Sequence, residues 1–199
     1  MQIIHGKTGW IEVICGPMFS GKSEELIRRI RRAQIAKQRI QLFKPQIDNR
    51  YSEDEIVTHD QQRLPSMPVP TSNAILDALQ DKTAVVGIDE AQFFDDDITS
   101  VCNKLANLGK RVIVAGLDMD YRGHPFEPIP RLMAIAEYVT KQLAICVRCG
   151  NPANHTQRLI GDKHRIVVGS QGTYEARCRQ CFEPPESELA DEVDEAAGS

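Results

Sequence analysis

A glycine-rich loop between a strand pattern and a helix pattern constrains this chain more than any other feature. The loop is Gly16-Pro17-Met18-Phe19-Ser20-Gly21-Lys22-Ser23, which fits the spacing G-x-x-x-x-G-K-[ST]. It follows the apolar run Trp10–Cys15 and precedes an amphipathic segment at residues 23–37. In such a loop the backbone N–H groups converge on a phosphate, and the next helix directs its positive end there. The sequence therefore predicts a nucleotide phosphate site, with Lys22 on the β- and γ-phosphates and Ser23 as a ligand of Mg²⁺.

A second motif ends another apolar run. Residues 83–88 read as a strand buried in a parallel sheet, and Asp89 and Glu90 follow it. The carboxyl edge of such a sheet is where ligands bind. We expect Asp89 to support the Mg²⁺ shell and Glu90 to act on a nucleophile.

Strand and helix patterns alternate along most of the chain. Strands are predicted at 10–15, 39–44, 83–88, 111–116 and 143–145, and helices at 23–37, 73–80, 97–108 and 131–138. This alternation predicts an α/β fold of the P-loop NTPase type, a mostly parallel sheet with helices on both faces. Residues 45–72 carry four prolines and little periodicity, which indicates a functional or mobile loop. The expected buried helix faces are Leu26, Ile27, Ile30, Ala33 and Ile35, and then Ile98, Val101, Cys102, Leu105 and Leu108.

Four of the six cysteines form two C-x-x-C pairs separated by 28 residues. The pairs are Cys146 with Cys149 and Cys178 with Cys181, the ligand set of a structural, tetrahedral Zn²⁺ site. Helical patterning also stops near residue 146, so we predict one domain at 1–145 and a small zinc ribbon at 146–182. We expect His155 and His164 at the surface, and Cys15 and Cys102 as buried, inert thiols.

The net charge of −4 hides an uneven distribution. Residues 183–199 contain seven of the 28 acids and no base, so residues 1–182 carry 24 bases against 21 acids, or +3. We expect residues 183–199 to form a solvated, disordered tail. The N-terminal residues lack the apolar core of a signal peptide, and no run is long enough to span a membrane. We therefore expect a cytoplasmic protein with no membrane partner.

Two other classes of protein share parts of this pattern. A zinc-ribbon nucleic-acid-binding module would use Arg28, Arg29, Arg31 and Arg32, but a charge of +3 is weak for that class, and we expect a solvated helix face and no nucleic-acid partner. A different P-loop enzyme, either an ATPase or a kinase for another nucleoside, stays open on the phosphate loop alone.

Several motifs in order resemble those of the thymidine kinase family, in its small cellular and bacterial type with a zinc-held lasso. The resemblance covers residues 9–182, nearly the whole chain except the tail. The motifs are the loop from Gly16 to Ser23, Lys44-Pro45 with Asp48-Asn49-Arg50-Tyr51, Asp89-Glu90-Ala91-Gln92-Phe93, Gly116-Leu117-Asp118 with Pro125-Phe126, and both cysteine pairs.

The resemblance implies roles for individual residues around ATP. The phosphate loop would bind the ATP phosphates, and Glu90 would be the base that accepts the proton of the nucleoside 5′-hydroxyl. Further residues implied near the phosphates and metal, or lining the active site, are Asp48, Asn49, Arg50, Asp89, Ala91 and Gln92.

The resemblance also implies a nucleoside pocket that the lasso covers. Tyr121 would lie against the thymine ring, where family members often carry Phe, so its hydroxyl needs a partner. Tyr174 would close the pocket. Lasso residues implied at the pyrimidine edge are Arg165, Ile166, Val167, Val168 and Gly169, and those implied around the 5-methyl group are Met18, Leu117 and Thr156.

The resemblance further implies an ATP-dependent transfer to thymidine, and also to deoxyuridine, with Mg²⁺ and a structural Zn²⁺. It implies a role in pyrimidine deoxynucleoside salvage for DNA synthesis. It implies a homotetramer that dTTP inhibits as a feedback product. Because the ribbon and the phosphate loop fall in different predicted domains, we expect loss of zinc to weaken thymidine binding much more than ATP binding.

Overall fold

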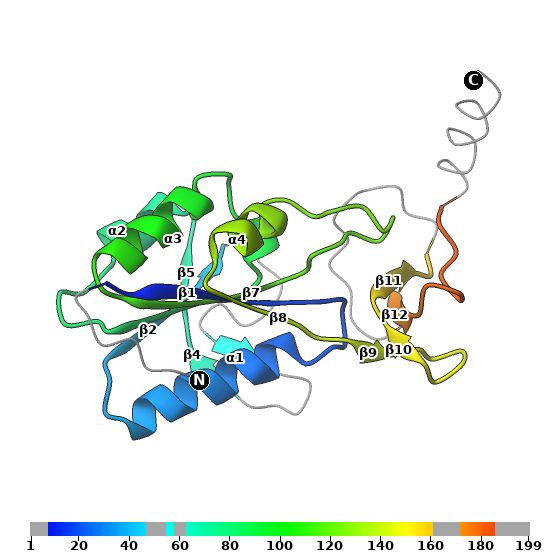
Figure 1. The fold of residues 1–199 in the computed structure, drawn as a ribbon, viewed down its shortest axis with the longest axis horizontal. Coiled ribbons are helices and arrows are strands. Elements are labelled where there is room, and N and C mark those ends of the chain that lie inside the picture. Colours follow the sequence, from blue (N-terminus) through cyan, green and yellow to red (C-terminus); the bar gives the residue numbers. More distant parts are fainter. Residues whose placement is uncertain (1–7, 47–54, 58–62, 161–171, 186–199) are drawn as a thin grey trace, which may run out of the picture.

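A six-stranded parallel sheet organises the molecule (Figure 1), and its strand order is β5-β2-β6-β7-β1-β8. The computed structural model describes residues 8–46, 55–57, 63–160 and 172–185. The sheet strands are β1 (Trp10–Cys15), β2 (Ile40–Pro45), β5 (Met67–Val69), β6 (Val85–Ile88), β7 (Arg111–Gly116) and β8 (Tyr138–Lys141). The predicted α/β fold is confirmed.

Helices cover both faces of the sheet (Figure 1). On one face, α1 (Lys22–Ile35) packs its buried side chains on Leu42, Val85 and Ile113. On the other face lie α2 (Asn73–Asp77), the 3₁₀ turn η1 (Ala91–Phe93), α3 (Ile98–Asn107) and α4 (Ile129–Ile135). Alternate residues of each central strand thus enter two separate cores.

Two predicted core positions are wrong. Ile35 is 82% exposed and Leu108 is 63% exposed. Ile35 is the last residue of α1, and Leu108 lies just beyond α3, so the chain is already turning away from the sheet at both places. The other eight members of the two predicted faces are buried.

Three predicted element boundaries also need correction. The stretch 45–72 contributes the edge strand β5, and the short hairpin of β3 (Glu55–Val57) with β4 (Arg63–Pro65). The helix predicted at 131–138 begins earlier, at Ile129, and Tyr138 already starts a strand. That strand, β8, and not residues 143–145, is the sixth strand. It was missed because an edge strand is only half buried and its residues are not continuously apolar.

A small ribbon follows the sheet, at residues 144–160 and 172–185. Its strands β9 (Ala144–Ile145) and β10 (Pro152–Ala153) pair, as do β11 (His155–Arg158) and β12 (Tyr174–Arg177). Pairing of β9 with β10 crosses the predicted domain boundary at residue 146. At the other end, Glu183 exchanges backbone–side-chain hydrogen bonds with Gln157, at 2.8 and 2.9 Å. Both domain boundaries stay predictions.

A buried carboxylate ties α1 to the sheet. Glu12 of β1 is fully buried and accepts hydrogen bonds from Arg29, Arg111 and Trp10 at 2.6–2.8 Å. Burial alone would raise the pKa of Glu12, but these donors outweigh it and the pKa is lowered. Arg29 therefore does not belong to the solvated arginine face, whereas Arg28, Arg31 and Arg32 are exposed as predicted.

None of the helices in the described ranges is long and apolar enough to cross a membrane.

Candidate active site

The phosphate loop leaves β1 through a glycine that nothing else could replace. Gly16 has φ 142°, and a Cβ there would lie 2.2 Å from the carbonyl oxygen of Gln142. Gly21 adopts the left-handed conformation, φ 81°, immediately before α1. The amine of Lys22 and the hydroxyl of Ser20 both donate to the Pro17 carbonyl, at 2.7 and 2.8 Å. These contacts shape the loop that the sequence predicts to bind phosphate.

The end of β6 brings an acid to the start of α1. The Ser23 hydroxyl donates to the Asp89 carboxylate at 3.1 Å. Burial, and then the charge of Glu90, raise the pKa of Asp89 to about 7. Burial also lowers the pKa of Lys22, which the charges of Glu90 and Asp89 oppose. The structure thus gathers the predicted metal ligand, its supporting acid and the phosphate lysine in one place.

Glu90 occupies a backbone conformation that few non-glycine residues adopt. Its φ is 51°, in the left-handed region, and its side chain is exposed at the carboxyl edge of the sheet. The amide of buried Gln92 donates to the Glu90 carboxylate and accepts the Leu117 N–H at 3.0 Å. A left-handed residue of this kind marks a functional constraint at many sites. Ala91, between Glu90 and Gln92, is fully buried.

A second cluster lies where the ribbon meets the loop after β7. Tyr121 and Tyr174, two predicted nucleoside-pocket residues, are both buried. Between them lies Arg158, whose guanidinium carbon is 3.5 Å from the centre of the Tyr121 ring and whose Nη2 donates to the Tyr174 hydroxyl at 2.9 Å. The hydroxyl of Tyr121 accepts a hydrogen bond from Arg122 at 3.1 Å, which supplies the partner that it needs.

Sequence reasoning missed Arg158. It lies directly opposite Tyr174 in the β11–β12 pair. No motif marks it in the sequence, and only that strand register brings it to the aromatic rings. Sequence reasoning also gave no role to Asp118, a buried carboxylate 2.8 Å from the amine of Lys141. These two residues follow β7 and end β8, so their ion pair spans the carboxyl end of β1.

The structure describes all three residues predicted around the 5-methyl group, Met18, Leu117 and Thr156, and each makes a hydrogen bond. Thr156 of β11 is buried and its hydroxyl accepts the Met18 N–H at 3.0 Å. Leu117 is joined to Gln92. The remaining predicted site residues lie outside the described residues: Asp48, Asn49, Arg50, Arg165, Ile166, Val167, Val168 and Gly169.

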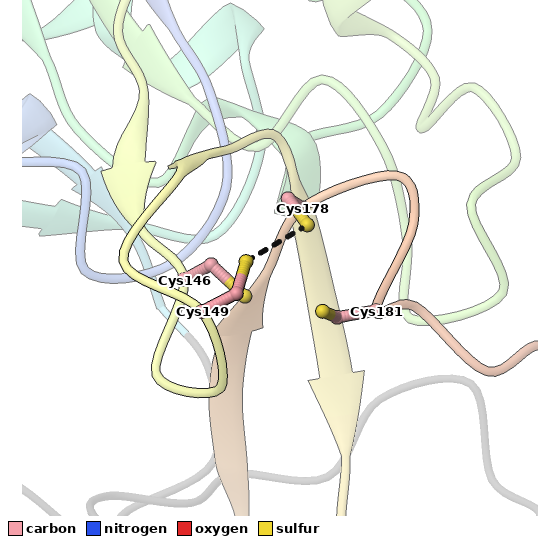
Figure 2. Close-up of side chains that lie close together, drawn as sticks. All are labelled: Cys146, Cys149, Cys178 and Cys181. Carbon is pink, nitrogen blue, oxygen red and sulfur yellow. Dashed lines mark hydrogen bonds between the residues drawn. The ribbon is translucent and has the colours of Figure 1, made fainter.

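The four ribbon cysteines converge as predicted (Figure 2). Their sulfur atoms all lie within 4.8 Å of one another, and Cys149 and Cys178 are 3.5 Å apart. A Zn–S bond of about 2.3 Å in tetrahedral geometry requires sulfurs about 3.8 Å apart. All four are free thiols, so the donor set and its spacing fit a zinc ion.

The other thiols and the nearby histidine behave differently. Cys15 and Cys102 are buried as expected, and burial raises their pKa values to about 11 and 12. His155, predicted at the surface, is buried, and its ring stacks on Phe182 with centroids 4.3 Å apart. The prediction failed because Phe182 folds back onto β11, which the sequence does not indicate. His164 lies outside the described residues.

Comparisons with known proteins agree with the geometry of the site. The model of the family described as "Thymidine kinase" matches residues 9–182. A protein named "Thymidine kinase" from Rhodothermus sp. (strain ITI 518) is 62% identical over 180 residues, which are 90% of this chain and 84% of that protein. Among solved structures, the Legionella pneumophila ATPase DotB is similar at 17% identity with a TM-score of 0.40, and the match covers 65% of this chain and 35% of that one. That structural likeness is too distant to identify the chain. The family match and the 62% identical relative show that this chain belongs to the thymidine kinase family.

Proposed function

We propose that this chain transfers the γ-phosphoryl group of ATP to the 5′-hydroxyl of thymidine, giving dTMP, and that Glu90 is the general base. One observation carries the assignment of the base: Glu90 directly follows Asp89, its charge acts on Lys22, and Gln92 holds its carboxylate on a left-handed backbone. An alcohol is a poor nucleophile at neutral pH, so a carboxylate must accept its proton during attack.

The phosphate loop orients the donor. Its backbone N–H groups and Lys22 bind the phosphates, and the positive charge of Lys22 offsets the charge on the transferred group. Ser23 and Asp89, joined by a hydrogen bond, would hold Mg²⁺, which would supply further charge neutralisation. Asp48, Asn49 and Arg50 belong near the same phosphates by their match to the family motif.

The aromatic cluster receives the nucleoside. Tyr121 lies against the base and Tyr174 closes the pocket, and Met18, Leu117 and Thr156 surround the methyl group of the base. Residues 165–169 bind the pyrimidine edge through backbone groups, as their match to the family motif implies. Arg158, stacked against Tyr121, fixes the position of that ring. A methyl group in an apolar pocket is worth about 1–3 kcal/mol, so deoxyuridine is also a substrate.

The ribbon cysteines would hold a structural Zn²⁺. The chain acts in the cytoplasm, where it salvages deoxynucleosides for DNA synthesis. A homotetramer is supported by apolar side chains left exposed along β8 and β9, such as Val139 and Ile145. We expect dTTP to act as a feedback inhibitor, because it carries both the base and the phosphates that this site binds.

A nucleoside panel tests the proposal. Purified protein with Mg²⁺ and ATP labelled at the γ-phosphate is incubated with thymidine, deoxyuridine, deoxycytidine and purine deoxynucleosides. The proposal requires label in dTMP, and in dUMP at lower efficiency. Label only in inorganic phosphate, or only in another nucleotide, would replace it with one of the alternative P-loop activities.

A further inference from the structure

The phosphate loop and the ribbon are joined by direct contacts between residues far apart in sequence. Met18, in the middle of the loop, donates its backbone N–H to the Thr156 hydroxyl at 3.0 Å, across 138 residues of chain. Thr156 is buried, so water is a poor substitute for that acceptor. A backbone group of the loop therefore depends on a ribbon side chain.

Phe19, the next residue, makes a second contact. It packs against the small core of the ribbon, which consists of Ala144, Cys146, Ala153, Ala176 and Cys178. Its φ is 64°, a left-handed conformation that costs a non-glycine residue energy and persists where the surroundings fix it. The surroundings here are the ribbon core, so the packing of Phe19 holds the loop in an unfavourable backbone conformation.

The chain that leads into the ribbon touches the loop at a third place. Gln142, between β8 and β9, donates its N–H to the carbonyl of Cys15 at 2.8 Å, and its own carbonyl occupies the space beside Gly16. The loop is thus held at Cys15–Gly16, at Met18 and at Phe19 by one continuous structural unit. These contacts argue against the expectation that the ribbon matters for the nucleoside and little for ATP.

We propose that the ribbon positions the phosphate loop for ATP, and that Thr156 and Phe19 are the positioning residues through which it does so. This inference rests on the proposed function for the identity of the nucleotide. Thr156 thereby serves both substrates, since it also belongs to the nucleoside pocket. Loosening these contacts lets the loop sample conformations that do not bind phosphate, and the apparent affinity falls with the competent fraction.

The first test removes one hydroxyl. Thr156→Val keeps the shape of the side chain but cannot accept the Met18 N–H, whereas Thr156→Ser retains the acceptor. ATP affinity is measured by calorimetry without nucleoside, so that changes in the nucleoside pocket do not contribute. We expect Thr156→Val to weaken ATP binding roughly 2- to 10-fold, the value of one hydrogen bond, and Thr156→Ser to restore most of it.

A matched control exists on the opposite side of the molecule. Thr99 of α3 has a buried hydroxyl with no hydrogen-bond partner, so Thr99→Val makes the same chemical change without touching the loop. Unchanged ATP affinity in Thr156→Val, or an equal loss in Thr99→Val, would overturn the proposal. Failure of Thr156→Ser to restore affinity would do so as well.

The second test needs no nucleotide. Hydrogen exchange is followed by mass spectrometry on the peptide that contains residues 16–20, in the wild type, Thr156→Val, Phe19→Ala and Thr99→Val. We expect faster exchange in the first two variants only, with the sheet peptides unchanged. Wild-type exchange in both variants would contradict the inference even if they bind ATP poorly. Because this readout uses no substrate, a failure of the proposed kinase activity in the nucleoside panel would leave it interpretable.

Discussion

The side chain of Gln92 holds Glu90 in place. Its amide nitrogen donates to the Glu90 carboxylate, while its amide oxygen accepts the backbone N–H of Leu117 at the end of β7. A neighbouring glycine makes room for this arrangement, because a Cβ at Gly116 would lie 2.9 Å from the Gln92 oxygen. The proposed base is thus connected through one amide to β7, which precedes the loop proposed to bind the nucleoside.

Replacing Gln92 by methionine should expose the importance of this connection. Gln92→Met keeps the length of the side chain, but Glu90 loses its donor and the Leu117 N–H loses its acceptor. We expect kcat to fall roughly 10- to 100-fold, as for loss of a hydrogen bond to a charged group, with the KM for ATP nearly unchanged. Steady-state kinetics would check this, and a wild-type kcat would show that Glu90 is positioned by its backbone alone.

Removing the base itself should have a larger effect. Glu90→Gln preserves shape but cannot accept the proton of the 5′-hydroxyl, so we expect kcat to fall by roughly 10²- to 10⁴-fold. ATP binding, measured by calorimetry, should be largely retained. The control is Glu127→Gln, an exposed glutamate that follows β7. Near-normal turnover of Glu90→Gln would move the assignment to another acid, with Asp48 the next candidate.

Lys22→Met should separate binding from stability. The variant loses the positive charge that faces the phosphates, so ATP binding should weaken and transfer should be abolished. Burial lowers the pKa of Lys22, which means that the charged amine is less stable in the fold than in the unfolded chain. We therefore expect the nucleotide-free Tm to stay the same or rise. Lys104→Met, on the exposed surface of α3, serves as the control, and a marked drop in Tm for Lys22→Met would contradict this reasoning.

The buried network of Glu12 should make stability depend on pH. Glu12→Gln leaves Arg29 and Arg111 without their carboxylate, and we expect a loss of roughly 3 kcal/mol in the free energy of unfolding at pH 7, at the lower end for a buried pair because both arginines are partly exposed. The pKa of Glu12 is lowered from 4.5, so its contribution is complete above that value and is lost as pH falls through the lowered pKa. Urea unfolding at a series of pH values should show the stabilities of the two proteins converging as the pH falls below 4.5. A constant difference at all pH values would exclude an ionic origin.

Cys178→Ser should weaken the binding of both substrates. With one of four thiolates replaced by a poor ligand, zinc content measured by elemental analysis should fall. The ribbon core, which includes Cys178, then loosens, and with it the supports of Phe19 and Thr156. We expect a higher KM for thymidine and a weaker ATP affinity, whereas Cys102→Ala, on the buried face of α3, should keep its zinc. Loss of zinc with both affinities intact would show that the metal does not support either site.

The sequence by itself determined the features whose physics is local. Three features depend on short spacings, so their positions could be predicted: the phosphate loop, the strand that leads to Asp89 and Glu90, and the two C-x-x-C pairs. Periodicity likewise predicted the buried faces of α1 and α3, except at their ends, where the chain leaves the sheet and Ile35 and Leu108 become exposed.

Only the tertiary structure decided which distant residues meet. Strand register and chain reversal leave no periodic pattern in the sequence. They decide the place of the half-buried edge strand β8, the stacking of His155 on Phe182 and the position of Arg158 over Tyr121. The same holds for the bond between Met18 and Thr156. A hydrogen bond between residues 138 apart depends on how two elements pack, and no short segment of sequence encodes that packing.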